Sequence, residues 1–243
     1  MRFQHSYRSH LIVALIAFSI GLLTAKSADR PRFAPAPVPT PPAASQPRAA
    51  YPAASPGPPQ LDARVRQQLE RLTKAADIVL DRIQNEEADL YMRIQYFEKP
   101  DRLDPNSYAS KDEVGQWQAN LQVLQDKSDL VGQLYANLQK NLEGELRSAG
   151  ANEEITSRFI NVVIAGFPWP TIEKKKQLLN RYIDQHGKLL SLYKKNWGLW
   201  KPTSTGNKPQ FDSTTTTSMY TKLRDEIVST GTELDKTYKE MTE

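Results

Sequence analysis

Apolar residues recur at alternating spacings of three and four along the chain after residue 60. One such seam begins at Val65 and ends at Phe97, shortly before Pro100 and Pro105. Residues with this spacing lie on one face of an α-helix, so the pattern predicts a long amphipathic helix that ends before the first of these prolines. Glu86 is the one clearly charged position on this seam.

A second seam begins just after residue 110 and is more regular than the first. Ser110 and Glu113 have the spacing of a capping box, in which each side chain accepts a backbone N–H at the start of a helix. Nine seam positions follow, of which only one, Ser128, is small and polar; they are Val114, Trp117, Leu121, Leu124, Ser128, Val131, Tyr135, Leu138 and Leu142. Such a register is typical of long helices that pack nearly parallel to one another.

The second half of the chain contains two further helical patterns. The third segment starts near residue 152, is interrupted by the sequence GFPWP at 166–170, and resumes over 172–200, where a proline two residues later stops it. The polar stretch 203–217 predicts a mobile loop, and the seam over 220–238 predicts a fourth helix. No segment has the convincing pattern of a β-strand.

Four long amphipathic segments without a strand predict an all-α fold. The expected architecture is an elongated four-helix bundle with coiled-coil-like seams, connected up-down-up-down and about 50 Å long. The same seams could pair between chains as an intermolecular coiled coil, so a homo-oligomer is the alternative to a single-chain bundle. In either case the folded domain is expected to span residues 61–243.

Residues 1–30 have the pattern of an export segment. Arg2 and Arg8 precede a run of 15 uncharged residues from Leu11 to Ala25. This run is shorter than the roughly 20 residues of a typical membrane span and suits a signal peptide, although a short uncleaved signal anchor is also compatible with it. The pattern predicts an exported protein, periplasmic or otherwise extracytoplasmic, that is either released or anchored in the inner membrane by residues 11–25.

Residues 31–60 form a linker that holds 11 of the 17 prolines of the chain. Proline removes backbone donors and favours polyproline II with a rise of about 3.1 Å per residue, so the linker can extend over about 90 Å. It is expected to be disordered and to separate the export segment from the folded domain. A proline-rich ligand for an SH3-like groove is the alternative, but no basic residue recurs beside a PxxP core.

Charge and cysteine content exclude several classes of protein. Residues 1–60 contain six basic residues and one acidic residue, whereas the remainder contains 26 basic and 27 acidic residues. The folded part therefore lacks the net positive charge of a nucleic-acid-binding surface. The chain has no cysteine, which excludes lipoprotein anchoring and thiolate chemistry. No catalytic motif is present, so no enzyme, cofactor or metal site is expected.

Three polar residues on the seams are candidates for a ligand-binding or switch site. Glu86 and Ser128 interrupt the first two seams, and His186, the one histidine of the folded part, lies on the third. The simpler interpretation of His186 is a partly buried, hydrogen-bonded core residue, and that of Glu86 is an exposed or ion-paired side chain. The neighbouring acids Glu87 and Asp89 are expected to be solvated.

Basic and aromatic residues are concentrated in the third segment. Residues 171–201 contain eight basic and two acidic side chains, whereas residues 111–148 and 212–243 have an acidic excess. One interpretation is structural: a basic helix packs between two acidic ones. The other is a contact with an acidic partner or an anionic membrane surface. The candidate contact residues are Trp169, Tyr193, Lys194, Lys195, Trp197, Trp200 and Lys201.

Together these patterns predict a non-enzymatic interaction or scaffold protein of a cell-envelope assembly. Its export segment and linker would hold the helical bundle away from the membrane, where it contacts an envelope protein. One alternative is a ligand-sensing four-helix module that binds a small molecule near Glu86, Ser128 and His186. Another is a membrane-surface tether that holds the bundle on anionic lipid.

Overall fold

The computed structural model of the protein describes residues 63–202 and 209–242, so the predicted export segment and the predicted linker lie outside the described residues. The described part is mostly helical and contains six α-helices, which confirms the predicted all-α class. The helices are α2 (Ala63–Phe97), α3 (Lys111–Ala136), α4 (Leu138–Ser148), α5 (Glu153–Ala165), α6 (Trp169–Lys195) and α7 (Thr214–Thr242).

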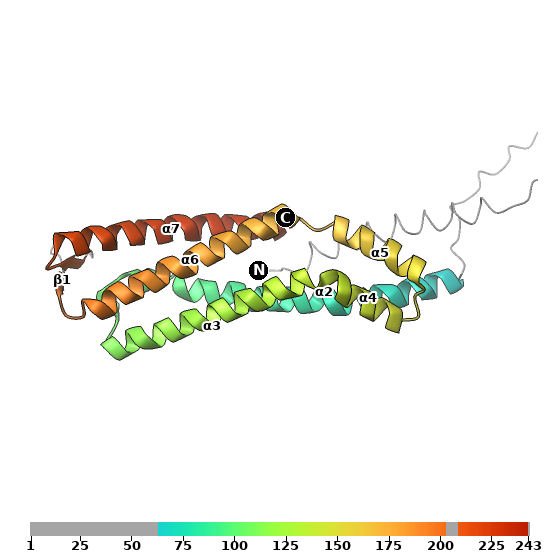
Figure 1. The fold of residues 1–243 in the computed structure, drawn as a ribbon, viewed down its shortest axis with the longest axis horizontal. Coiled ribbons are helices and arrows are strands. Elements are labelled where there is room, and N and C mark those ends of the chain that lie inside the picture. The colour runs from blue at the N-terminus through green and yellow to red at the C-terminus, as the bar shows by residue number, and fades with distance from the viewer. Residues whose placement is uncertain (1–62, 203–208, 243) are drawn as a thin grey trace, which may run out of the picture.

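The long helices run lengthwise through an elongated molecule (Figure 1). Helix α6 packs against α7 and also against α3, while α2 packs against α3 and α4. Helix α5 contacts α4 and leads the chain to the start of α6. None of the described helices is both long and apolar enough to cross a bilayer. The packing leaves α6 between α3 and α7, and this position determines the candidate site described below.

Helix α3 begins with the capping box predicted from the sequence. The Ser110 hydroxyl accepts the backbone N–H of Glu113 (3.1 Å), and the Glu113 carboxylate accepts the backbone N–H of Ala109 (2.7 Å). The seam that follows was predicted as one helix but is interrupted at Asn137, between α3 and α4. The Asn137 side chain donates to the carbonyl of Gln133 (2.9 Å), a local bond that competes with regular helix geometry. The leucines of α4 are nevertheless buried, so the apolar seam continues past the interruption.

The predicted proline break separates α5 from α6. Pro170 lies in the first turn of α6, where the missing proline N–H removes no helical hydrogen bond. Trp169 stacks on Phe167 (5.4 Å between ring centroids) and meets Tyr135 edge-on (6.3 Å). Its indole N–H donates to the carbonyl of Ile164 (2.9 Å). Trp169 therefore stabilises the corner between the two helices.

Two predictions about the segment after α6 are wrong. The helix ends at Lys195 rather than at Trp200, and Gly198 adopts a φ of +77°, a left-handed conformation that turns the chain out of the helical path. The sequence predicts no strand here, but β1 (Trp200–Pro202) pairs antiparallel with β2 (Pro209–Phe211). Trp200 lies opposite Phe211, and such aromatic cross-strand pairs stabilise short ladders.

Two buried tyrosines hold the connection between α2 and α3 against the core. This connection contains two short 3₁₀ helices, η1 (Pro100–Leu103) and η2 (Pro105–Ser107). The hydroxyls of Tyr193 in α6 and Tyr220 in α7 both donate to the carbonyl of Leu103, at 2.8 and 2.9 Å. A carbonyl oxygen has two lone pairs and can accept both bonds. The connection is thereby fixed beside the β1–β2 hairpin.

Candidate functional site

The structure brings six of the seven predicted contact residues to one end of the molecule, beside the β1–β2 hairpin (Figure 1). These are Tyr193, Lys194, Lys195, Trp197, Trp200 and Lys201. Trp169 lies at the opposite end of α6, a helix of 27 residues and therefore about 40 Å long. The predicted contact residues consequently do not form one surface.

The aromatic residues at the hairpin end pack on one another. The ring of Trp200 contacts those of Trp197, Tyr193 and Phe211, with centroid distances of 5.2, 6.4 and 5.8 Å. The indole N–H of Trp200 donates to Asn106 (3.0 Å). Tyr193 is fully buried, and burial raises the pKa of its phenol well above the ordinary value. Tyr193 therefore supports the fold and is not an exposed contact residue.

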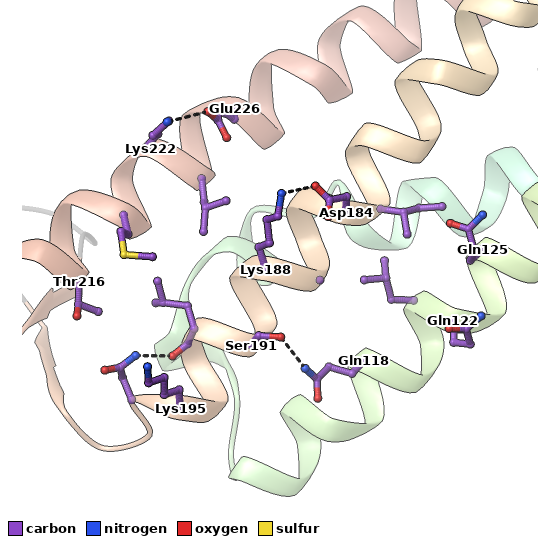
Figure 2. A pocket seen from close by; sticks show the side chains of 17 residues that line it. Gln118, Gln122, Gln125, Asp184, Lys188, Ser191, Lys195, Thr216, Lys222 and Glu226 are labelled. Atoms are coloured by element: carbon purple, nitrogen blue, oxygen red, sulfur yellow. Dashed lines mark hydrogen bonds and ion pairs between the residues drawn. The ribbon is translucent and has the colours of Figure 1, made fainter.

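A groove of about 1000 Å³ begins at the hairpin end and crosses α3, α6 and α7 (Figure 2). Along α6 it extends from Ile183 to Asn196, a length of about 20 Å. Lys195 is the one predicted contact residue in its lining. The α3 side presents three amide side chains, and apolar side chains come from all three helices. These groups are Gln118, Gln122 and Gln125, and Leu121, Ile183, Leu192, Met219 and Leu223.

Most charged groups in the groove are paired with one another (Figure 2). Lys188 lies 2.5 Å from Asp184 on α6, and Lys222 lies 3.8 Å from Glu226 on α7. Lys195 forms no ion pair with any residue that the structure describes. Among the residues that the structure describes, the groove therefore carries one unpaired positive charge, at the end next to the hairpin.

Polar contacts also join α3 to α6 at this end. The amide of Gln118 donates to the Ser191 hydroxyl (3.2 Å), and the Lys194 ammonium donates to the Gln118 oxygen (3.2 Å). Lys194 and Lys201 are exposed and form no ion pair within residues 63–202 and 209–242. Three exposed lysines thus lie at the hairpin end, with Lys195 facing the groove.

The three predicted ligand residues do not converge on one site. Glu86 accepts from Lys127 (2.6 Å), the ion-paired state that one interpretation of the sequence predicts. Ser128 is buried and lines a separate cavity of about 220 Å³. His186 is buried against Phe97, which lies eleven residues beyond Glu86 on α2, a distance of about 16 Å along the helix. No single ligand of small size contacts all three.

His186 is a core residue, but it differs from the expected hydrogen-bonded histidine. Its ring lies 5.4 Å from the ring of Phe97 and 4.5 Å from that of Tyr182, between centroids. Its Nε2 atom has no hydrogen-bond partner among the described residues. Burial lowers the pKa of the imidazole to about 3, so the side chain is neutral at physiological pH.

Glu87 is not solvated, contrary to the prediction. It is buried and forms an ion pair with Lys175 of α6, which is also buried. The Tyr238 hydroxyl of α7 donates to the second carboxylate oxygen (3.4 Å). The Lys175 ammonium lies over the rings of Tyr135 and Tyr238, 5.3 and 5.4 Å from their centroids. Burial lowers the pKa of Lys175 and the charge of Glu87 opposes this shift. The pair joins α2, α6 and α7 in the core.

The charge asymmetry between the helices matches the structural interpretation. The basic helix α6 packs between α3 and α7, the two segments with an acidic excess. Lys174 of α6 lies 3.3 Å from Glu233 of α7, an ion pair between two of these helices. Part of the positive charge of α6 is therefore used in contacts within the molecule.

Within residues 63–202 and 209–242, no group of three or more histidine, aspartate or glutamate side chains is placed to hold a metal ion. Comparisons with protein families, curated proteins and solved structures found no match. The function is therefore inferred from the residues and geometry of this chain alone.

Proposed function

We propose that the protein is an exported, membrane-tethered interaction protein of a cell-envelope assembly. In this proposal the linker at residues 31–60 holds the folded domain away from the membrane. Helices α2, α3, α6 and α7 act as one four-helix bundle, with α4 extending α3. The groove across α3, α6 and α7 receives the partner, and the proposed interaction role rests on this groove.

The partner that fits the groove is an amphipathic helix with acidic residues at one end. The length of about 20 Å accommodates roughly four turns of a docked helix. The apolar side chains of the lining supply anchoring contacts, and Met219, which is 53% exposed, can adapt to different partner side chains. Acidic residues at the hairpin end would face Lys195, with Lys194 and Lys201 nearby, which favours one orientation of the docked helix.

An anionic membrane surface has less support than a protein partner. Trp197 and Trp200 pack against each other and against the hairpin instead of projecting as membrane anchors. Lys174, Lys175 and Lys188 are ion-paired within the molecule, so fewer positive charges of α6 are available to lipid headgroups.

Site-specific crosslinking in cells that produce the full-length chain tests this function. A photo-crosslinking amino acid replaces Met219 in the groove, and Met92 on α2 is the matched control because it is the same residue type, 58% exposed and outside the groove. We expect a crosslink from position 219, but not from 92, to an amphipathic helical segment of an envelope protein. Crosslinks from both positions, or from neither, would contradict the proposal. A crosslink from 219 to a second copy of the chain would replace the envelope partner by a homo-oligomer.

Two changes in the same experiment separate the groove from the linker. Lys195→Glu is expected to reduce the yield of the 219 crosslink about tenfold, because it places a negative charge opposite the acidic end of the partner. Lys140→Glu on α4, an exposed position outside the groove, is expected to leave the yield unchanged. Deletion of residues 31–60 is expected to abolish the crosslink without loss of helicity by circular dichroism. Undiminished capture after this deletion would remove the spacer role.

A further inference from the structure

A second cleft, of about 290 Å³, opens between the C-terminal end of α2 and α7. It shares no lining residue with the groove of Figure 2. The fully buried Tyr182 of α6 lines it from the core side. The remaining lining residues are Phe97, Glu98 and Leu103, and on α7 Ile227, Val228, Gly231, Thr232 and Asp235. The cleft therefore combines apolar walls with two carboxylates and a buried phenol.

Gly231 is the point at which α7 approaches the polar groups of the cleft. A Cβ atom at this position would lie 3.3 Å from a ring carbon of Tyr182 and 3.9 Å from a carboxylate oxygen of Glu98. The phenol ring and the carboxylate thus converge on the same space beside the glycine. Any larger residue at 231 would narrow this space.

The hydroxyl of Tyr182 lacks a hydrogen-bond partner among the described residues. The side chain is only 1% exposed, and a buried hydroxyl without a partner costs free energy that a bound group can recover. Burial, and to a smaller extent the charge of Glu98, raises the pKa of this phenol. The hydroxyl is therefore neutral, and its oxygen can accept a hydrogen bond.

The carboxylates of the cleft favour a cation. Asp235 is already engaged, because it accepts from the Tyr91 hydroxyl (2.9 Å) and pairs with Lys239 (2.7 Å). Glu98 forms no ion pair with the described residues. Desolvation and the neighbouring Asp235 charge raise the pKa of Glu98, and the charge of Lys239 partly opposes this shift.

We propose that this cleft binds a small organic cation, a primary ammonium on an apolar body. The ammonium group donates to the Glu98 carboxylate and to the Tyr182 hydroxyl oxygen, and the body lies against the four apolar side chains of the lining. A bare metal ion fits poorly, because hard cations take about six oxygen ligands and the lining supplies only two carboxylates. An anion would meet the repulsion of both acids. This site is independent of the partner groove.

Isothermal titration calorimetry with benzylamine tests the proposal on the full-length chain, purified in an alkyl maltoside. Benzyl alcohol has a similar size without the charge, and benzoate carries the opposite charge. We expect benzylamine to bind at least about tenfold more tightly than benzyl alcohol, because only its ammonium group forms a charged hydrogen bond with the Glu98 carboxylate. Benzoate is expected not to bind. Equal affinity for benzylamine and benzyl alcohol, or no binding of benzylamine, would overturn the proposal.

Variants locate the binding in the cleft. Glu98→Gln is expected to weaken benzylamine binding at least about tenfold, because it removes the negative charge, and Tyr182→Phe about threefold, because it removes the hydroxyl acceptor. Gly231→Ala adds a methyl group beside the Tyr182 ring and is expected to weaken binding while favouring the helix. Glu145→Gln on α4 is the charge-matched control and is expected to bind like the wild type. Circular dichroism checks that each variant is folded. Wild-type affinity in Glu98→Gln would place the cation elsewhere and refute the site.

Discussion

Glu87→Gln is expected to lower the free energy of unfolding by about 3–5 kcal/mol, because it removes one partner of a buried ion pair. Lys175 is only 3% exposed in the folded state and lines the cavity of about 220 Å³ that also contains Ser128. An amide cannot neutralise its ammonium group, and the rings of Tyr135 and Tyr238 compensate for only part of the lost interaction. The remaining charge must then either stay buried without a carboxylate or lose its proton at a cost in free energy.

The double variant Glu87→Leu/Lys175→Met is expected to be within about 1 kcal/mol of the wild type, because apolar replacement of both partners removes the desolvation cost together with the attraction. Urea unfolding of the full-length chain, followed by circular dichroism, measures each free energy. Lys188→Met is the control, since Lys188 forms an exposed ion pair on the same helix; its loss is expected to cost less than about 0.5 kcal/mol.

The two variants together distinguish a pair that stabilises the fold from one whose attraction only offsets its own desolvation cost. A destabilised Glu87→Gln beside a stable double variant would mean that the pair adds little net stability, and that the loss arises from leaving one charge buried without its partner. A loss in Glu87→Gln as small as that of Lys188→Met would show that Lys175 reaches water. A double variant as unstable as Glu87→Gln would show that the attraction exceeds the desolvation cost.

Local signals in the sequence were sufficient to predict the start of α3 and the break between α5 and α6, but not the interruption at Asn137 or the end of α6 at Lys195. The capping box at Ser110 depends on residues three positions apart, and the break before Trp169 depends on prolines that cannot donate a backbone N–H. The hairpin was missed because strands of three residues show too little alternation to be detected. Its formation depends on contacts of Trp200 and Phe211 that only the folded chain provides.

The choice between Glu86 and Glu87 shows where sequence reasoning reaches its limit. Either acid fits a seam with spacings of three and four, since Ile83 and Leu90 flank both. The structure buries Glu87 because its partner, Lys175, lies 88 residues away in the sequence on a different helix. A lysine at the seam spacing between Ile172 and Leu179 was the available signal that a buried cation needed a partner.

The candidate sites could not be predicted from the seams for a related reason. The groove contains residues of three helices, and the second cleft contains residues of α2, α6, α7 and η1. A helical seam predicts which face of a helix is buried, but not where neighbouring helices separate. Lys195 was predicted as a contact residue because basic and aromatic residues are concentrated in its segment of the sequence. Met219 and Glu98 carried no sequence signal that distinguishes them from other exposed residues.

Acidification from pH 7 to pH 5 is expected to cost the folded state about 2 kcal/mol through His186 alone. Burial lowers the pKa of this imidazole from 6.5 to about 3, so between these values the unfolded chain binds a proton that the folded chain does not. The stability of the folded state is therefore not reduced by His186 above pH 6.5, and it falls progressively as the pH is lowered toward 3. At the lower limit the accumulated loss is about 5 kcal/mol, which is comparable to the total stability of many domains.

His186→Leu isolates this contribution, because it removes the titrating group and keeps an apolar side chain of similar size between Phe97 and Tyr182. Urea unfolding of both full-length chains at pH 7, 6 and 5 gives the two pH dependences. Their difference cancels the other titrating groups, including Asp89 and Asp235, whose lowered pKa values also make acid destabilising. We expect the variant to lose about 2 kcal/mol less than the wild type between pH 7 and 5. Parallel pH dependences would mean that the imidazole is protonated in the folded state, and the core around α6 would then have to admit water.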